Sequence, residues 1–378
     1  MTTYRDIPAN DLYLVDMASN AKKPLVANVK SGARVLIITD TRQDPLVWKV
    51  MAMAVQDLGG DPMVTVITPR PVDYYDPPQP VLEALKHADL GILLASTTML
   101  HAPGCDEVME LGVPLIAMDG GMTRDMLTMG AATADYRMIQ EINHLVAVGV
   151  FGEDPDEIRM TSDFGTDITC SIKGRMAIPK KPGDGYIPLR VQRWSGTEDY
   201  GSRKGASLYG FAFPGGEVNT APIEDSGQGT LVIDTTMHNV GRIDHPIKLT
   251  IRDGRIVDID GEYEADQLRD YLLLYGDDNS WYMPTEFAVG TNYAARVTGL
   301  QREDKNILGC VHVGLGTNKD IGGTLQAKLH MDGVILKPTV YVDGVRKIDR
   351  GHVLYLEECG MYDRLLKARQ EQAARGAT

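Results

Sequence analysis

The residues best suited to chemistry are histidines and carboxylates in the second half of the sequence. The sharpest unit is the segment Leu329–Ile335, in which His330 and Asp332 are two positions apart. In a β-strand, residues i and i+2 lie on the same face, so an imidazole and a carboxylate would project together. Such a pair is a common way to bind a divalent metal, although the same spacing also fits a His–Asp pair on the surface of a strand.

Three further side chains could contribute to the same site. His312 alternates with apolar residues and shares a strand face with Cys310 and Gly314, where a hydrogen-bonded core histidine is the competing interpretation. Glu217 follows two glycines and is expected in a tight turn between prolines, either in the site or as an ordinary exposed glutamate. Glu286 lies in an otherwise apolar segment, where a carboxylate requires a cation, either Lys, Arg or a metal.

These five side chains offer two imidazoles and three carboxylates, an inventory that suits one or two divalent ions. The elements that must position them belong to the second half of the chain, which differs from the first half in composition and in its pattern of apolar residues. Before residue 155 the chain alternates short apolar runs with helical periodicity. After it, glycine, threonine and aspartate separate short alternating runs, which is typical of antiparallel strands.

The first half predicts a doubly wound parallel α/β domain over residues 1–155. An entry helix is expected within residues 1–30. The expected strands are 35–39, 63–67, 90–94 and 114–118, and the expected helices are 44–58, 78–87, 106–111, 123–129 and 134–148. Asp44 is the predicted N-cap of its helix, with Pro45 at the first helical position. No GxGxxG or GxxxxGK[ST] motif follows these strands, which argues against a dinucleotide or ATP site.

The second half, residues 156–378, predicts a mostly antiparallel α+β domain that carries the metal site. The expected strands are 169–172, 230–234, 247–252, 255–259, 311–315, 339–342 and 353–356. Asp253-Gly254 and Asp343-Gly344 are hairpin-turn signals. Residues 264–275 form an amphipathic helix, and the tail from Met361 is helical.

The composition narrows the classes of binding partner that are expected. Among 378 residues, 52 acidic side chains outnumber 38 basic ones, and the net charge of −14 argues against nucleic acid or an anionic membrane as the main partner. We find no apolar run long enough to span a membrane and no signal-peptide pattern at Met1–Asp6. The four cysteines lack CxxC spacing, so reduced, mostly buried thiols in a cytoplasmic protein are expected.

With these residues in view, the second half resembles the aminopeptidase T/aminopeptidase S family of metallopeptidases. The matching pieces occur in family order around Glu217, Glu286, His312 and the pair His330 and Asp332. The resemblance implies that these five residues bind two divalent ions, Zn, Mn or Co, with one carboxylate bridging them. It also implies a metal-activated water that hydrolyses an amide bond, and an oligomeric protein.

The whole chain also resembles the 2,5-dihydroxypyridine 5,6-dioxygenases, ring-cleaving iron enzymes built on the same scaffold. The shared segments are Met99–Pro103, Ser162–Phe164, Glu262–Tyr271 and the glycine loop Gly316–Gly323. That resemblance implies Fe(II) bound by two histidines and one aspartate. His330 and Asp332 match this set, whereas the second histidine position aligns with Glu286 here, and His312 offers a substitute imidazole.

The sequence departs from the peptidase pattern at the groups that handle protons. The peptidases place a glutamate a few residues before the histidine that matches His312, where this chain has Asn306–Gly309, and a tyrosine after it, where this chain has Lys319 and Asp320. Candidate catalytic residues are therefore His101 after the 90–94 strand, Lys319 as an oxyanion contact, and Asp167.

The favoured hypothesis is a dinuclear metallohydrolase, aminopeptidase- or amidohydrolase-like, that cleaves a C–N bond of a small molecule or short peptide. The alternative is a non-haem iron(II) dioxygenase that opens a hydroxylated pyridine or similar ring. A third hypothesis is a non-catalytic binding module that retains only the residues around the site. We expect a homo-oligomer that binds neither nucleic acid nor membrane.

Overall fold

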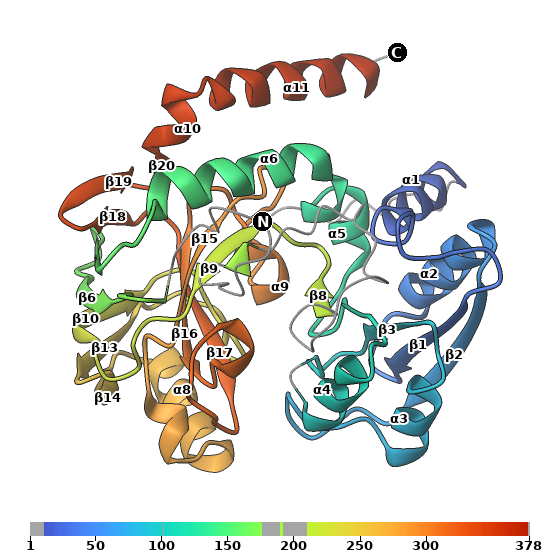
Figure 1. Cartoon of the computed structure of the whole chain (residues 1–378), viewed down its shortest axis with the longest axis horizontal. Coiled ribbons are helices and arrows are strands. Elements are labelled where there is room, and N and C mark those ends of the chain that lie inside the picture. The colour runs from blue at the N-terminus through green and yellow to red at the C-terminus, as the bar shows by residue number, and fades with distance from the viewer. Residues whose placement is uncertain (1–10, 101, 176–189, 192–209, 377–378) are drawn as a thin grey trace. The chain divides into compact units, whose positions relative to one another are not determined.

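The computed structural model describes residues 11–100, 102–175, 190–191 and 210–376 (Figure 1). Contacts divide the chain into two compact units. The first comprises Met1–Tyr136 and Trp194–Gly215, and the second comprises Arg137–Arg193 and Gly216–Thr378. This division differs from the expected single boundary at residue 155. Residues 137–155 belong to the second unit, and Trp194–Gly215 belong to the first.

The first unit contains, within the described residues, a parallel sheet of five strands in the order β2-β1-β3-β4-β8. The strands are β1 (Arg34–Asp40), β2 (Asp61–Ile67), β3 (Leu90–Leu94), β4 (Leu115–Ala117) and β8 (Gly210–Ala212). The helices are α1 (Asp11–Lys22), α2 (Pro45–Asp57), α3 (Gln79–Leu85), α4 (Pro103–Glu110) and α5 (Arg124–Thr128), with a 3-10 turn η1 (Ala131–Thr133). The order reverses at β1, as in a doubly wound sheet, so the predicted fold class is confirmed.

Local sequence explains most of these boundaries. The carboxylate of Asp44 accepts the Leu46 N–H at 2.9 Å and Pro45 begins α2, as predicted. α4 begins earlier than expected because Pro103 takes its first position. β8 was not predicted; it pairs in parallel with β4, which is why this segment belongs to the first unit.

The second unit contains two antiparallel sheets among the residues placed by the structure. One has eight strands: β14 (Arg255–Asp260), β13 (Ile247–Arg252), β10 (Gln228–Ile233), β6 (Asp167–Ser171), β5 (Glu157–Thr161), β18 (Thr339–Val342), β19 (Val345–Asp349) and β20 (His352–Val353). The other has seven: β12 (Gly241–Arg242), β11 (Thr236–Met237), β17 (His330–Ile335), β16 (Val311–Gly316), β15 (Glu286–Gly290), β9 (Glu217–Thr220) and β7 (Arg190–Val191).

The helices of this unit are α6 (Tyr136–Val146), α8 (Tyr263–Tyr275), α9 (Gln301–Asp304), α10 (Leu354–Glu358) and α11 (Met361–Gly376). Short helical turns are η2 (Ala147–Phe151), η3 (Asp278–Trp281) and η4 (Lys319–Ile321). α6 belongs here, and not to the first domain as expected, because Ile142 and Val146 join the core formed by both antiparallel sheets.

Turn chemistry confirms the predicted hairpins. Asp253 and Gly254 both have positive φ, 48° and 70°, and connect the antiparallel strands β13 and β14. The expected strand 353–356 is wrong, because after the two residues of β20 the chain turns into α10 and buries Leu356 in the core. Of the helices in the described ranges, none is long and apolar enough to cross a bilayer. All four cysteines are free, and Cys359 alone among them is exposed.

Candidate metal centre

The five predicted ligands converge on one face of the seven-stranded sheet. They come from four neighbouring strands, with Glu217 on β9, Glu286 on β15, His312 on β16, and His330 and Asp332 on β17. All five are buried, between 0% and 8% exposed. Glu217 is the first residue of a strand and not part of a turn, so the expected loop at this position is corrected.

The two-residue period of the strands separates the core from the site. On β16, Val311 and Val313 pack into the hydrophobic core, while His312 and Gly314 face the other side. The same alternation on β15 sends Phe287 into the core and Glu286 into the site. A sheet whose one face is a packed core therefore presents five polar side chains rigidly on its other face.

Glycine leaves the room that the ligands need. Gly314 lies opposite Glu286 on one side and opposite Asp332 on the other. A Cβ atom at this position would lie 2.8 Å from Cβ of Glu286, 3.0 Å from Cε1 of His330 and 3.3 Å from Oδ1 of Asp332. The side chains that converge here therefore require a residue without a side chain between them.

Both imidazoles are held by main-chain oxygens. Nδ1 of His312 lies 3.2 Å from the carbonyl oxygen of Lys305, and Nδ1 of His330 lies 2.7 Å from that of Thr317. A carbonyl oxygen can only accept, so each Nδ1 carries a proton, and the neutral form of each ring presents an Nε2 lone pair to the site. Metal-binding histidines are oriented in the same way.

The carboxylates are oriented by protein donors on one side only. Oε1 of Glu286 accepts a 2.7 Å hydrogen bond from the amide of Asn219. Oδ2 of Asp332 accepts hydrogen bonds from Gln301 and from Lys305, the latter at 3.1 Å. The other two oxygens face Nε2 of His330, at 2.9 Å from Glu286 Oε2 and 3.1 Å from Asp332 Oδ1.

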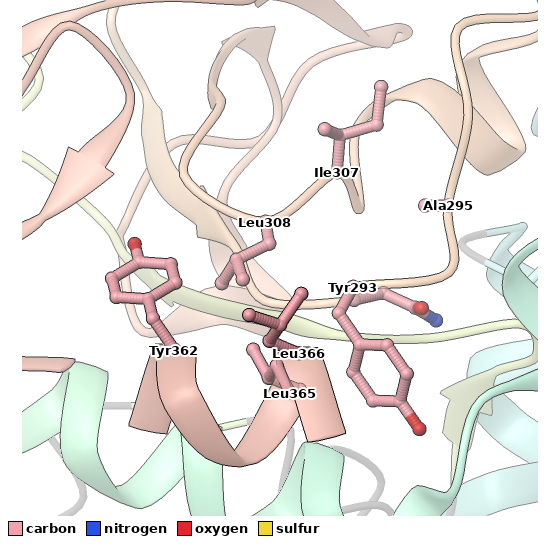
Figure 2. A pocket seen from close by; sticks show the side chains of 8 residues that line it. Tyr293, Ala295, Ile307, Leu308, Tyr362, Leu365 and Leu366 are labelled. Atoms are coloured by element: carbon pink, nitrogen blue, oxygen red, sulfur yellow. The ribbon is translucent and has the colours of Figure 1, made fainter. Parts of the chain in front are cut away.

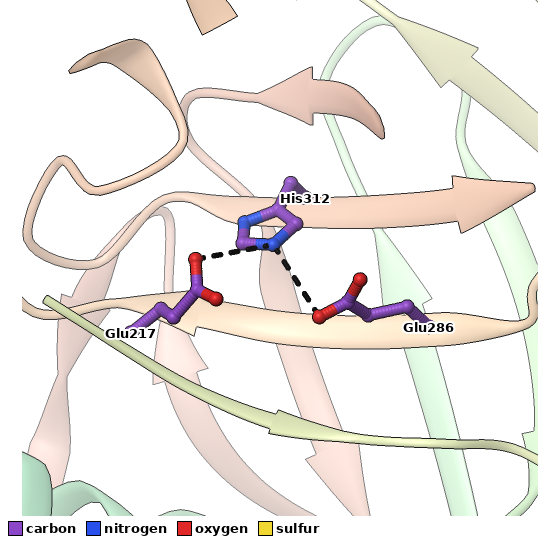
Figure 3. Close-up of side chains that lie close together, drawn as sticks. All are labelled: Glu217, Glu286 and His312. Atoms are coloured by element: carbon purple, nitrogen blue, oxygen red, sulfur yellow. Dashed lines mark ion pairs between the residues drawn. The ribbon is translucent and has the colours of Figure 1, made fainter. Parts of the chain in front are cut away.

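The ligand atoms fall into two groups that share Glu286. One group is Glu217, Glu286 and His312, and the other is Glu286, His330 and Asp332; within each, the ligand atoms lie within 4.8 Å of one another. Figure 3 shows the first group, in which Nε2 of His312 lies 3.6 Å from Glu217 and 3.9 Å from Glu286.

A divalent metal fits these donors. Within the described part of the chain, the buried atoms Nε2 of His312 and Oδ1 of Asp332 make no hydrogen bond. A lone pair on His330 Nε2 at 2.9 Å from a carboxylate oxygen is repulsive unless a proton or a metal ion lies between them. Imidazole nitrogen with carboxylate oxygen is a donor set for Fe, Mn or Zn.

Neighbouring charged groups shift the pKa values of these side chains in the direction opposite to the effect of burial. Burial raises the pKa of Glu286, but the neighbouring imidazoles of His312 and His330 hold it well below its usual value. Burial likewise raises the pKa of Asp332, and Lys305 and His330 hold it well below the usual value. Burial lowers the pKa of His330, yet Asp332 and Glu286 raise it well above that of a free histidine.

Lys305 is the functional candidate that the sequence comparison missed. Its side chain is only 15% exposed, and its Nζ lies 3.1 Å from Asp332 Oδ2 and 3.5 Å from Glu217 Oε2. Burial lowers its pKa, but Asp332, Glu217 and Glu286 outweigh burial and raise the pKa above the ordinary value. The stretch that departs from the peptidase pattern, Asn306–Gly309, begins directly after Lys305, and the spacing of four residues between Gln301 and Lys305 is the signal in the sequence that the two side chains lie on one face.

The loop that carries Lys305 is anchored by the carboxylate of the preceding residue. Asp304, fully buried, accepts hydrogen bonds from the main chain of Thr298 and Gly299 and from the hydroxyl of Thr236. The next residues, Ile307 and Leu308, line a separate cavity of about 310 Å³ (Figure 2). Its other lining residues are Asn292, Tyr293, Ala295, Tyr362, Leu365 and Leu366.

Two of the three predicted catalytic residues are described by the structure, and neither is part of this cluster. His101 lies outside the described residues. Lys319 is exposed in η4. Asp167 is exposed on β6, in the other sheet, and its carboxylate forms an ion pair with Arg159 at 2.8 Å. That pairing lowers the pKa of Asp167 and gives the side chain a structural contact.

Comparison with known proteins identifies a matching family and a relative of known activity. A family model described as 2,5-dihydroxypyridine 5,6-dioxygenase matches residues 21–355. The chain is 30% identical over 295 residues to the 2,5-dihydroxypyridine 5,6-dioxygenase of Pseudomonas putida KT2440, a match that covers 73% of each chain.

Two solved structures share the fold. The structure of the 2,5-dihydroxypyridine dioxygenase from Pseudomonas putida KT2440 has a TM-score of 0.68 at 18% identity, covering 90% of this chain and 97% of that one. AmpT from Thermus thermophilus has a TM-score of 0.58 at 13% identity, covering 90% and 99%. Both families that the sequence resembles are therefore represented among its structural neighbours.

Proposed function

Because the chain belongs to the 2,5-dihydroxypyridine 5,6-dioxygenase family, we propose that it is a metal-dependent enzyme that opens a hydroxylated N-heteroaromatic ring with O₂. The observation that carries the proposal is the convergence of Glu286 Oε2, Asp332 Oδ1 and His330 Nε2, with separations of 2.9 and 3.1 Å from the imidazole nitrogen. A face of three such donors leaves further positions on a metal open to substrate and O₂.

Each of the three donors is oriented by a residue that does not itself bind the metal. Asn219 holds Glu286, Gln301 holds Asp332, and the carbonyl of Thr317 holds His330. Fe(II), when bound there, would supply the binding and reduction of O₂. The protein supplies a dry site in a fixed geometry, since every one of these ligands is buried.

Lys305 gives the site a positive charge beside the ligands. A hydroxylated heteroaromatic ring carries an oxygen that can be deprotonated, and the ammonium of Lys305 would stabilise that oxyanion beside the ligand set. Because Lys305 also contacts Glu217 and its pKa is raised, the ammonium holds its proton at the edge of the ligand set.

The test is oxygen consumption by purified protein loaded anaerobically with Fe(II), with 2,5-dihydroxypyridine as the probe. We expect O₂ uptake that matches the loss of the ring's ultraviolet absorbance. His330→Ala should abolish both signals, whereas His245→Ala, which removes an exposed histidine paired with Glu264, should leave them unchanged. Absence of O₂ uptake with this probe and with related hydroxypyridines would refute the proposal.

A second candidate is amide hydrolysis with two metal ions. It is favoured by the arrangement of the five donors in two groups that share Glu286, since a bridging carboxylate is usual in two-metal hydrolases. The same protein would then cleave short peptides or lactams without oxygen in the presence of Zn, Mn or Co. Cleavage in an anaerobic chamber, lost in the Glu217→Ala variant, would replace the dioxygenase proposal with this one.

A further inference from the structure

The buried charges of the site do not match two metal ions. Glu217, Glu286 and Asp332 contribute three negative charges, and Lys305 contributes one positive charge within 3.5 Å of two of them. Counting both histidines in their neutral, metal-binding form, two negative charges remain. One divalent cation neutralises them, whereas two would leave an uncompensated charge of the opposite sign in a buried site.

The positions of the donors agree with this charge count. Glu286, His330 and Asp332 form the tight group, in which carboxylate oxygens lie 2.9 and 3.1 Å from the imidazole nitrogen. In the second group the corresponding distances from His312 are 3.6 and 3.9 Å. The ammonium of Lys305 contacts both groups, at 3.1 Å from Asp332 of the tight group and 3.5 Å from Glu217 of the wider group.

Lys305 also contacts two of the three carboxylates, those of Asp332 and Glu217. It binds the oxygen of Asp332 that faces away from His330, and it contacts the oxygen of Glu217 that faces His312. In a two-metal site, the second ion would lie between Glu217 and His312, and Oε2 is the oxygen of Glu217 that lies 3.6 Å from Nε2 of His312. A lysine side chain and a second cation therefore compete for one position.

We propose that the ammonium group of Lys305 takes the place of a second metal ion, so that the site binds one divalent cation at Glu286, His330 and Asp332. The inference rests on the proposed metal-dependent function and adds the number of ions and the residue that sets it. Lys305 then presents N–H donors to the substrate where a second metal would present a Lewis acid.

The experiment counts metal ions per chain. Purified protein is dialysed to equilibrium against Mn(II), and bound metal is measured by elemental analysis and by electron paramagnetic resonance. We expect one ion per wild-type chain, with the spectrum of an isolated Mn(II) centre. In Lys305→Met, which removes the charge and keeps the length of the side chain, we expect two ions with a spin-coupled spectrum.

The control is Lys337→Met, which removes an exposed lysine just after β17 and should bind one ion. Lys305→Gln repeats the test with a polar side chain in case the methionine variant fails to fold. Two ions in the wild-type chain would overturn the inference without any variant. One ion in a folded Lys305 variant would overturn it as well.

These outcomes are distinct from a failure of the proposed function. A wild-type chain that binds no metal refutes the metal-dependent function itself. A wild-type chain that binds two ions leaves a metal enzyme in place but removes the role assigned to Lys305, and it supports the hydrolase candidate.

Discussion

The main-chain oxygen of Lys305 lies 3.2 Å from Nδ1 of His312, so one residue supports the site from both its backbone and its side chain. The carbonyl fixes the tautomer of His312, and the ammonium contacts Asp332 at 3.1 Å. Any displacement of this loop would therefore alter an imidazole and two carboxylates together.

The loop's anchor gives a stability prediction. Asp304→Ala removes a buried carboxylate that accepts hydrogen bonds from Thr298, Gly299 and Thr236. Because it leaves buried donors without an acceptor, we expect a loss of about 3 kcal/mol in the free energy of unfolding, measured with urea. Asp163→Ala, which breaks an exposed ion pair with Arg350, should cost less than about 1 kcal/mol. Equal losses in the two variants would contradict the anchoring role.

The glycine between the ligands gives a second prediction. Gly314→Ala places a Cβ within 3.0 Å of Glu286 and 3.3 Å of Asp332, so the ligands must move apart. We expect a loss of metal binding together with a destabilisation of about 1–3 kcal/mol. Titration calorimetry and thermal unfolding measure the two effects.

The matched control for this variant is on the neighbouring strand. Gly333→Ala places its Cβ 2.5 Å from the flexible end of Ile233, on the core face of β17. It should also destabilise the fold but leave metal affinity intact. Normal metal binding by Gly314→Ala would show that the ligands do not need this space.

The residue behind Glu286 gives a third prediction. Asn219→Ala removes the amide that holds Oε1 of Glu286 at 2.7 Å. Loss of such an orienting contact lowers metal affinity by about 10–100-fold, measured by competition with a chromophoric chelator. Asn279→Ala, whose amide binds the carbonyl of Gln326 outside the site, should leave affinity unchanged. An unchanged affinity in Asn219→Ala would contradict the orienting role of Asn219.

The pKa shifts predict opposite losses of stability at the two ends of the pH range in metal-free protein. The pKa of Glu286 and that of Asp332 are depressed on folding, so their contribution is present above about pH 4 and is lost as pH falls through the folded values. The pKa of His330 is raised, so its contribution is complete below about pH 6.5 and is lost as pH rises through the folded value.

Metal binding should reverse the alkaline loss. A metal ion competes with the proton on His330, so the rise in Tm on adding Mn(II) should grow between pH 6 and pH 9. Thermal unfolding with Mn(II) or with EDTA across this range measures the difference. A rise that does not depend on pH would mean that His330 binds no metal.

The chemistry of the site could be predicted from sequence because it follows strand periodicity. The spacing of His330 and Asp332 predicts that both lie on one face of a strand. In the structure, Nε2 of His330 lies 3.1 Å from Oδ1 of Asp332. The imidazole of His312 and the carboxylate of Glu286 stood out because they interrupt apolar segments. Polar residues in such segments must converge on partners if they are to be buried.

Other features depended on contacts that no local pattern encodes. Lys305 was missed because a lysine in a polar loop looks like any exposed lysine until the loop folds over the sheet. Gly215 and Gly216 before Glu217 predict a turn at this position. The pairing of β9 with β15 decides instead that the segment is a strand. The strand expected at 353–356 became α10 because burial of Leu356 outweighed its alternating pattern.

The pairing of β4 with β8 ties the folding of the first unit to the order of synthesis. When the ribosome has made the first 155 residues, β4 still has an open edge whose N–H and C=O groups await a strand at Gly210–Ala212. A fragment cut at residue 155 would expose this edge to another copy of itself and should aggregate. The nascent chain must likewise keep the edge of β4 from pairing wrongly until more than 50 further residues have emerged.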